Sequence, residues 1–311
     1  MIICAVGVFI DISVITVAPI ALAIGKKSGY HKEALLLAMI GGGKAGNIIS
    51  PNPNTIAVSE AFKVDLTSLM MKNFIPAICA VVVTILLSTM LSKKQGVQVT
   101  ENDLEQKEDK NLPSFIQAVA GPVVVVILLA LRPVASIVID PLIALPVGGV
   151  VCALACGQIK NIREYAEFGL GKVVGVSVLL IGTGTIAGII KASALQYDVV
   201  HILKMANMPA FLLAPIAGIL MAGATASTTA GATIGAQTFA GTLIKSGVSA
   251  LSAGAMVHAG ATVIDSLPHG SFFHATGGAA GLEIKERMKL IPYEMCGGLT
   301  STVVAVMRYV I

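Results

Sequence analysis

The stretch GGGKAGNIISPNPNTIAVSE, residues Gly41 to Glu60, interrupts sequence that is otherwise apolar enough to enter a membrane. A second stretch of the same kind, AGATVIDSLPHGSFFHATGG, runs from Ala259 to Gly278. An unpaired backbone amide is costly in hydrocarbon, so non-helical backbone at that depth persists only where protein buries it or where it lines a wet cavity. Two such breaks, each flanked by apolar spans, predict discontinuous helices that meet around a binding site.

Composition places the chain in a membrane. Hydrophobic residues make up 55% of the 311 residues, charged residues only 12%, and the mean hydropathy is +0.87; soluble domains carry about 25% charged residues. The apolar runs are continuous rather than alternating, which favours helices over barrel strands. We therefore expect an all-α, polytopic transmembrane helical bundle, multi-pass in the cell (inner) membrane, with the lipid bilayer as a partner. The net charge of +4 gives no indication of a nucleic-acid partner, and assembly as a homo-oligomer stays open.

An internal repeat organises the chain. Setting Pro51 against Pro268 gives an offset of 217 residues (268 − 51), and the first 94 residues then match the final 94 in hydropathy. We predict the C-terminal part of a first transmembrane repeat over 1–94, a polar inter-repeat loop over 95–112 and a second repeat over 113–311. Residues 113–217 have no counterpart upstream, so we expect a chain that lacks the N-terminal part of its first repeat or is completed by another polypeptide.

The first polar stretch offers groups that a bound anion would use. Two prolines remove amide donors around SPNPN, which leaves neighbouring carbonyls and Asn side chains free to coordinate a ligand. A helix that begins near Thr55 would direct its N-terminal amides at the same point, where a carboxylate is favoured. The alternative is a tight turn between two spans. The expected substrate contacts here are Ser50, Asn52, Asn54 and Thr55. Lys44 either pairs with the substrate carboxylate or couples charge movement, or it extends to the membrane surface.

The second stretch contains ionisable side chains, which inside a membrane are candidates for function. His258 and Asp265 are seven residues apart and would share one face if the helix continued, so they are candidates to relay a coupling proton. The alternative for Asp265 is an N-cap in the turn before Pro268. The spacing of the histidines fits no zinc site, so no metal is expected. The expected substrate contacts here are Ser266, His269 and Ser271.

A small, hydroxyl-rich tract and a single aspartate complete the polar inventory of the apolar regions. The tract GATASTTAGATIGAQ, residues 223–237, either lines a polar pathway or allows helices to pack closely. Its candidate pathway-lining residues are Ser227, Thr228, Thr229 and Thr233. Asp11, which stands alone in a long apolar span, is a further candidate for proton or cation coupling, or it pairs with a partner outside this chain.

Taken together, these segments resemble the gluconate permease family, which are proton symporters for gluconate and related small organic acids. The resemblance lies in SPNPNTIA (50–57), LLIGTGTIAGIIKASA (179–194), GATASTTAGATI (223–234) and HAGATVIDSLPHGSFFHATGG (258–278), and it covers nearly the whole chain. It implies an ion-transporter architecture of paired inverted repeats with two broken or re-entrant helices near the midplane. Asn52 and Asn54 stand where gluconate carriers commonly have histidine and glycine, so the substrate can be another hydroxy or keto acid.

The hypothesis from sequence is a secondary active transporter for gluconate or a related small organic acid anion, coupled to protons or to sodium and needing no other cofactor. An enzyme is disfavoured because neither a GxSxG nor an HExxH motif places a nucleophile or a metal. The alternatives that remain are an inactive truncated fragment, a non-transporting membrane subunit and a channel.

Overall fold

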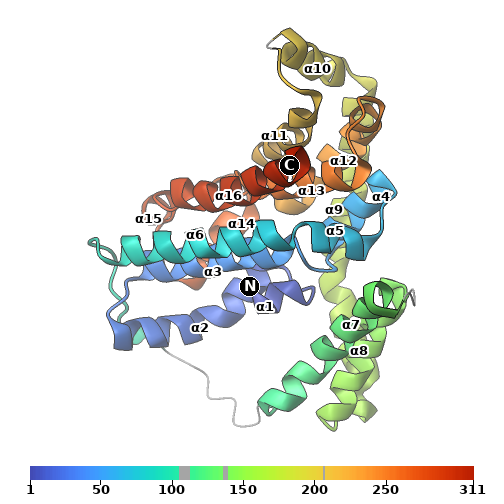
Figure 1. Ribbon diagram of the computed structural model, residues 1–311. Helices are drawn as coiled ribbons and strands as arrows, with labels where there is room; N and C mark the ends of the chain where they lie inside the picture. Colours follow the sequence, from blue (N-terminus) through green and yellow to red (C-terminus); the bar gives the residue numbers. More distant parts are fainter. Residues whose placement is uncertain (105–112, 136–138, 206) are drawn as a thin grey trace. The chain divides into compact units, whose positions relative to one another are not determined.

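The computed structural model describes residues 1–104, 113–135, 139–205 and 207–311, and every regular element in those ranges is helical (Figure 1). The predicted all-α fold is therefore confirmed for the described part of the chain. The α-helices are α1 (Ile2–Ala5), α2 (Ile10–Ser28), α3 (Lys32–Asn47), α4 (Pro53–Phe62), α5 (Leu66–Lys72), α6 (Phe74–Ser92), α7 (Phe115–Ala135), α8 (Pro141–Ala155), α9 (Ile162–Ala192), α10 (Leu195–Met205), α11 (Leu213–Thr225), α12 (Thr228–Lys245), α13 (Ala250–Gly260), α14 (Ser271–Ala279), α15 (Ile284–Met288) and α16 (Ile291–Val310). Short 3-10 turns are η1 (Glu101–Leu104), η2 (Ile159–Asn161) and η3 (Ala210–Leu212).

The chain forms two compact units. The large unit comprises residues 1–106 and 183–311, and the small unit comprises residues 107–182. In the large unit α3 lies against α2 and α6, while α16 lies against α6 and α13 (Figure 1). In the small unit α7 and α8 pack as a pair, with Val125 and Ala144 buried between them. Both polar stretches of the sequence belong to the large unit.

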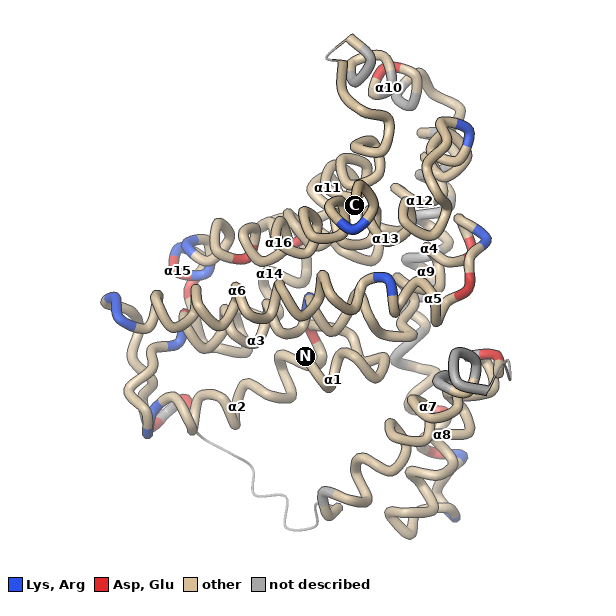
Figure 2. Tube along the Cα trace, viewed as in Figure 1, with Lys and Arg blue, Asp and Glu red and all other residues tan. Residues whose placement is uncertain are grey.

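Two long helices of the large unit bury mainly small and hydroxyl residues and expose large apolar side chains. In α6 the buried positions include Ala77, Thr84 and Ser88, whereas the exposed positions include Ile78, Val82, Ile85 and Leu86. In α16 the buried positions are Glu294, Gly297, Gly298, Ser301, Thr302 and Ala305. Charged residues lie mostly at the ends of helices (Figure 2). This reverses the pattern of a water-soluble protein and suits a lipid-facing surface, where small residues mediate helix contact. By length and composition, the stretches Phe74–Ser92 and Ile284–Val310 each suffice to cross a bilayer.

The helices of residues 1–94 and 211–311 begin at matching intervals. The starts of α2 and α12, α3 and α13, α4 and α14, and α5 and α15 are each separated by 218 residues (for example, 228 − 10), and those of α6 and α16 by 217 (291 − 74). The contacts also correspond, because α2 packs on α3 as α12 packs on α13, and α3 on α6 as α13 on α16. Across the two sets, α2 contacts α14 and α4 contacts α12. Each set therefore contributes a helix to the other's break.

Both helix breaks are narrower than the polar stretches that predicted them. The first lies between Asn47, where α3 ends, and Pro53, where α4 begins. The glycines at positions 41–43 and 46 lie within α3 rather than in the break. Neighbouring helices pack closely on them: a Cβ on Gly41 would lie 2.3 Å from the Thr84 side chain. The second break lies between Gly260 and Ser271, where α14 begins. The helix that carries His258 therefore stops before Asp265, and the predicted shared helical face does not form.

The described part of the predicted polar loop, residues 95–104, closes over the start of α3, and we call it the clasp. The Lys32 ammonium lies 2.6 Å from Asp103 Oδ1 and 3.3 Å from the carbonyl oxygen of Gly281, which follows α14. The amide of Val97 donates to Glu33 Oε2 at 2.9 Å. Lys32, at the start of α3, thereby contacts both the clasp and the segment after the second break, outside the two stretches that suffice to cross a bilayer.

The ion pair of the clasp predicts a weak acid sensitivity. Burial would raise the pKa of Asp103, but hydrogen bonds from Lys32 and from the amide and hydroxyl of Thr100 outweigh it, so the pKa lies below the usual 3.8. A lowered carboxyl pKa stabilises the fold fully above 3.8, and this contribution is lost as the pH falls through the lowered value. We expect Asp103→Asn to be less stable than the wild type by about 1 kcal/mol at neutral pH. Melting temperatures measured along a pH series should show this difference shrinking in acid; a difference that grows in acid would contradict the assignment.

Candidate functional site

The first break is organised around Asn52, which caps α4. Its Oδ1 accepts a hydrogen bond from the Thr55 amide at 3.0 Å, and Pro53 occupies the first helical turn, where its missing amide costs nothing. Its Nδ2 donates to the Asn47 carbonyl oxygen at 2.7 Å and to Ser50 Oγ at 2.6 Å. Asn52 therefore holds the turn in shape. The Nδ2 of Asn47 and the Oδ1 of Asn54 are buried without a hydrogen-bond partner among the described residues.

The two polar stretches meet in a buried ion pair. Lys44 Nζ, from the first stretch, lies 2.5 Å from Asp265 Oδ1, from the second, and donates to the Thr262 carbonyl oxygen at 3.0 Å. Thr228, the first residue of α12, donates its hydroxyl to Asp265 Oδ2 at 2.5 Å, and Ser266 Oγ lies 3.1 Å from Asp265 Oδ1. Lys44 is 4% exposed and Asp265 is 1% exposed. Because burial of an unpaired charge is very costly, each of these two groups requires the other.

Two further charged residues extend this pair into a buried cluster of four. Glu294 Oε2, on α16, lies 3.6 Å from Lys44 Nζ, and the Arg287 guanidinium pairs with both oxygens of Glu294. Arg287 is 0% exposed, and its Nε also donates to Thr276 Oγ1 of α14 at 3.3 Å. With two cations and two carboxylates, the cluster of Lys44, Asp265, Glu294 and Arg287 has no net formal charge. It connects α3, the second break, α15 and α16.

Sequence reasoning missed Glu294 and Arg287 for different reasons. Glu294 lies in the last apolar span, in IPYEMCGG, and the rule that singles out ionisable residues inside membrane spans would have found it. Arg287 lies in the charged run KERMK, a setting typical of a loop at the membrane surface. In the structure its side chain is buried instead, and the guanidinium Cζ lies 4.9 Å from the centre of the Phe273 ring.

Other predicted site residues lie in varied surroundings. Asp11, in the first turn of α2, is partly exposed, whereas His269 and Ser271 are exposed. Ser227 is the N-cap of α12, where its Oγ accepts from the Ala230 amide at 3.2 Å. Buried polar groups without a hydrogen-bond partner in the described residues include the Thr233 hydroxyl and both ring nitrogens of His258. Thr229 is buried as well.

A small cavity adjoins the charged cluster. It measures about 10 Å³ and is lined by Lys44 and Glu294 together with the hydroxyl residues Thr84, Thr262 and Ser301. A cavity of that size holds about one water molecule. Its remaining lining is small and apolar, from α3, α6 and α16: Leu37, Gly41, Ala45, Ala80, Gly297 and Gly298.

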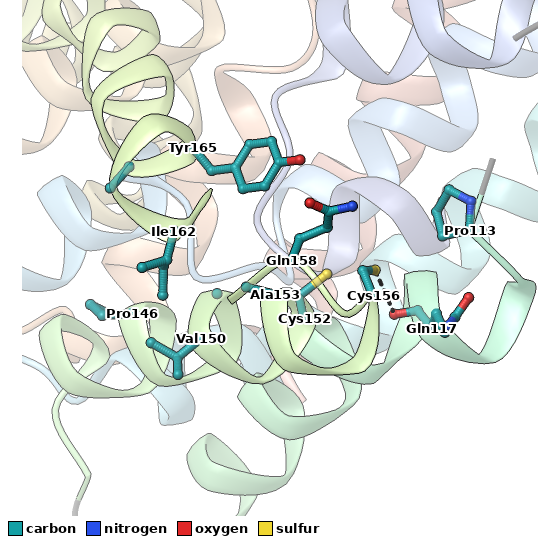
Figure 3. A pocket seen from close by; sticks show the side chains of 12 residues that line it. Pro113, Gln117, Pro146, Val150, Cys152, Ala153, Cys156, Gln158, Ile162 and Tyr165 are labelled. Atoms are coloured by element: carbon teal, nitrogen blue, oxygen red, sulfur yellow. Dashed lines mark hydrogen bonds between the residues drawn. The ribbon is translucent and has the colours of Figure 1, made fainter. Parts of the chain in front are cut away.

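The small unit holds a larger pocket of about 860 Å³, between α7, α8 and the start of α9 (Figure 3). Its polar groups come from Gln117, Gln158 and Tyr165, and Cys156 Sγ lies 3.9 Å from the Gln117 carbonyl oxygen. Among the described residues, the rest of its lining is apolar and carries no charged side chain. The described lining thus offers no counter-charge to a carboxylate, so the charged cluster of the large unit is the better candidate for an anion site.

Two comparisons show which known proteins the whole chain is similar to. The sequence profile described as GntP family permease matches residues 1–311. The chain is also similar to an uncharacterized transporter of Haemophilus influenzae, with 52% identity over 309 residues. That alignment covers 99% of this chain and 74% of the relative.

Proposed function

We propose that this chain, which belongs to the GntP permease family and is thus a membrane transporter rather than an enzyme, moves gluconate or a related small organic acid anion together with protons. The observation that carries the proposal is the ion pair between Lys44 and Asp265, which brings the two helix breaks together in one buried place. As a multi-pass protein of the cell membrane, the chain would expose this place to each side in turn. The two sets of helices with matching intervals are suited to act as inverted repeats that move against each other.

The first break supplies groups for binding the substrate. A small hydroxy acid carries a carboxylate, which needs a cation or several donors, and hydroxyls, which need both donors and acceptors. Asn47 Nδ2 and Asn54 Oδ1 are the open polar atoms of this break, and Lys44 lies one helical turn before Asn47 on α3. We assign Asn47 and Asn54 to substrate contact, alongside Thr55 and Ser50, with Asn52 holding the turn in position.

Charge balance supports coupling to protons. The cluster is formally neutral, so an anion that enters beside it brings an uncompensated negative charge into a buried place. Protonation of Asp265 removes one negative charge, and the released Lys44 ammonium can then pair with the substrate carboxylate. Substrate and proton would each favour binding of the other, which is the requirement for symport.

The experiment that tests the proposal is uptake of radiolabelled gluconate and other hydroxy acids into vesicles containing the purified protein, with and without a proton gradient. We expect a gradient to drive accumulation by the wild type, and Asp265→Asn to lose at least about tenfold of gradient-driven uptake because the coupling carboxylate is gone. The control is Asp65→Asn, since Asp65 caps α5 and asparagine caps helices equally well. Uptake that ignores the gradient in the wild type would remove the symport assignment, and flux without accumulation would indicate a channel.

A further inference from the structure

The ammonium of Lys44 is surrounded by oxygen atoms from separate segments. Asp265 Oδ1 lies at 2.5 Å, the Thr262 carbonyl oxygen at 3.0 Å and Glu294 Oε2 at 3.6 Å. Carboxylate and carbonyl oxygens are also the ligands that hard metal cations prefer. The Lys44 side chain thus places its ammonium group, a monovalent cation, among oxygen atoms that would otherwise suit a free metal ion.

The cavity beside the ammonium leaves no room for a second, hydrated cation. It measures about 10 Å³, the space of roughly one water molecule, and the hydroxyl residues Thr84 and Ser301 are part of its lining. In the described part of the chain, the charges facing this place are Lys44 of α3, Asp265 of the second break, Glu294 of α16 and Arg287 of α15. Their formal sum is zero, so the cluster offers another cation no net attraction to offset the loss of its hydration.

We propose that the Lys44 ammonium occupies the position of a bound monovalent metal cation, so that the protein requires no sodium ion. If the proposed function holds, transport is then coupled to protons alone, and this consequence rests on that function. The assignment of the cation position does not depend on the proposed function. Without the lysine side chain, Asp265 and Glu294 would face Arg287 alone, and the resulting negative charge and free space would recruit a sodium or a small ammonium ion.

Thermal unfolding of the purified full chain in detergent, in sodium, potassium, methylammonium or choline chloride, tests the position directly. We expect the wild type to melt at the same temperature in all four salts. Lys44→Ala should melt lower by on the order of 5–10 °C in choline, since it breaks a buried ion pair. Sodium or methylammonium should restore a substantial part of that loss, because either ion fits the vacated oxygens, whereas choline is too large.

Two control variants separate the cation position from general destabilisation. Lys93→Ala removes an exposed lysine at the end of α6 and should show no dependence on the cation. The double variant Lys44→Met with Asp265→Asn keeps the cluster neutral through Arg287 and Glu294, so it should melt above Lys44→Ala in choline and should not respond to sodium.

Two results would overturn the inference: stabilisation of the wild type by sodium specifically, or a loss in Lys44→Ala that is the same in every salt, including failure to fold in all of them. The readout needs neither substrate nor flux. A chain that transports no organic acid but whose Lys44→Ala variant recovers in sodium would refute the proposed function and leave the cation position standing.

Discussion

Replacing Arg287 with methionine is expected to lower the free energy of unfolding by about 3–5 kcal/mol, because it leaves the Glu294 carboxylate buried without its main cationic partner. Arg287 is fully buried, pairs with both carboxylate oxygens of Glu294 and donates to Thr276. Methionine retains an unbranched apolar side chain against Phe273. The loss of unfolding free energy therefore measures the removal of the charge rather than the creation of a large cavity. Thermal or denaturant unfolding in detergent measures the effect.

The double variant Arg287→Met with Glu294→Gln is the informative companion. Removal of both charges should cost less than the sum of the two single changes, since neither group is then left unpaired. The matched control is Arg163→Met, which breaks an ion pair with Glu167 in which the two side chains are 90% and 64% exposed. That pair should contribute at most about 0.5 kcal/mol. Equal losses from Arg287→Met and Arg163→Met would contradict the description of the buried cluster.

Replacing Gly298 with alanine is expected to destabilise the large unit by more than about 2 kcal/mol and to abolish transport. A Cβ at this position would lie 2.5 Å from the Thr262 carbonyl oxygen and 2.6 Å from Val263 Cα. Both are backbone atoms of the second break, so neither can rotate away as a side chain would. The Thr262 carbonyl is also an acceptor for Lys44, and its displacement would disturb the ion pair with Asp265.

Gly278 provides the comparison for this substitution. It lies in α14, where a Cβ would meet nothing within 4 Å. Alanine should be neutral there or raise stability by about 0.5–1 kcal/mol, since it reduces the entropy of the unfolded chain. Uptake and melting temperature measured for both variants separate the loss of a close backbone contact from the general effect of replacing a helical glycine. Equal behaviour of the two would show that α16 does not pack closely on the second break.

The sequence predicted the helical fold from its continuous apolar runs, and the meeting of the two breaks from the cost of unpaired backbone in hydrocarbon. It did not predict the ion pair between Lys44 and Asp265, because the two residues are distant in sequence and each had another expected partner. The width of the first break could not be predicted in this way. A glycine run is compatible with a turn or with a helix, and the choice depends on neighbours such as Thr84, which are distant in sequence.

The candidate site was predicted less completely, because residue types alone do not determine whether a side chain faces the interior or the surface. His269 and Ser271 lie in the second polar stretch with Ser266, yet the chain turns outward there and leaves the first two exposed. Asn52 has the residue type expected of a substrate ligand, but its side chain serves the turn itself. Conversely, Arg287 has the setting of a surface loop and is fully buried. These distinctions arise from tertiary contacts that local sequence does not contain.

The reversed polarity of α6 and α16 bears on how this protein can change over evolution. On their inward faces the limit is volume: at Gly298 even a Cβ would meet the backbone of the second break, whereas the small hydroxyl residues Ser301 and Thr302 are accommodated nearby. On their outward faces the limit is polarity, and any apolar shape at Ile85 or Val303 remains soluble in lipid. In homologous chains we therefore expect the outward face of each helix to vary in side-chain size while it stays apolar. The inward face should exchange small residues for hydroxyl residues while it stays small. In water-soluble helical bundles the outward face is the polar one.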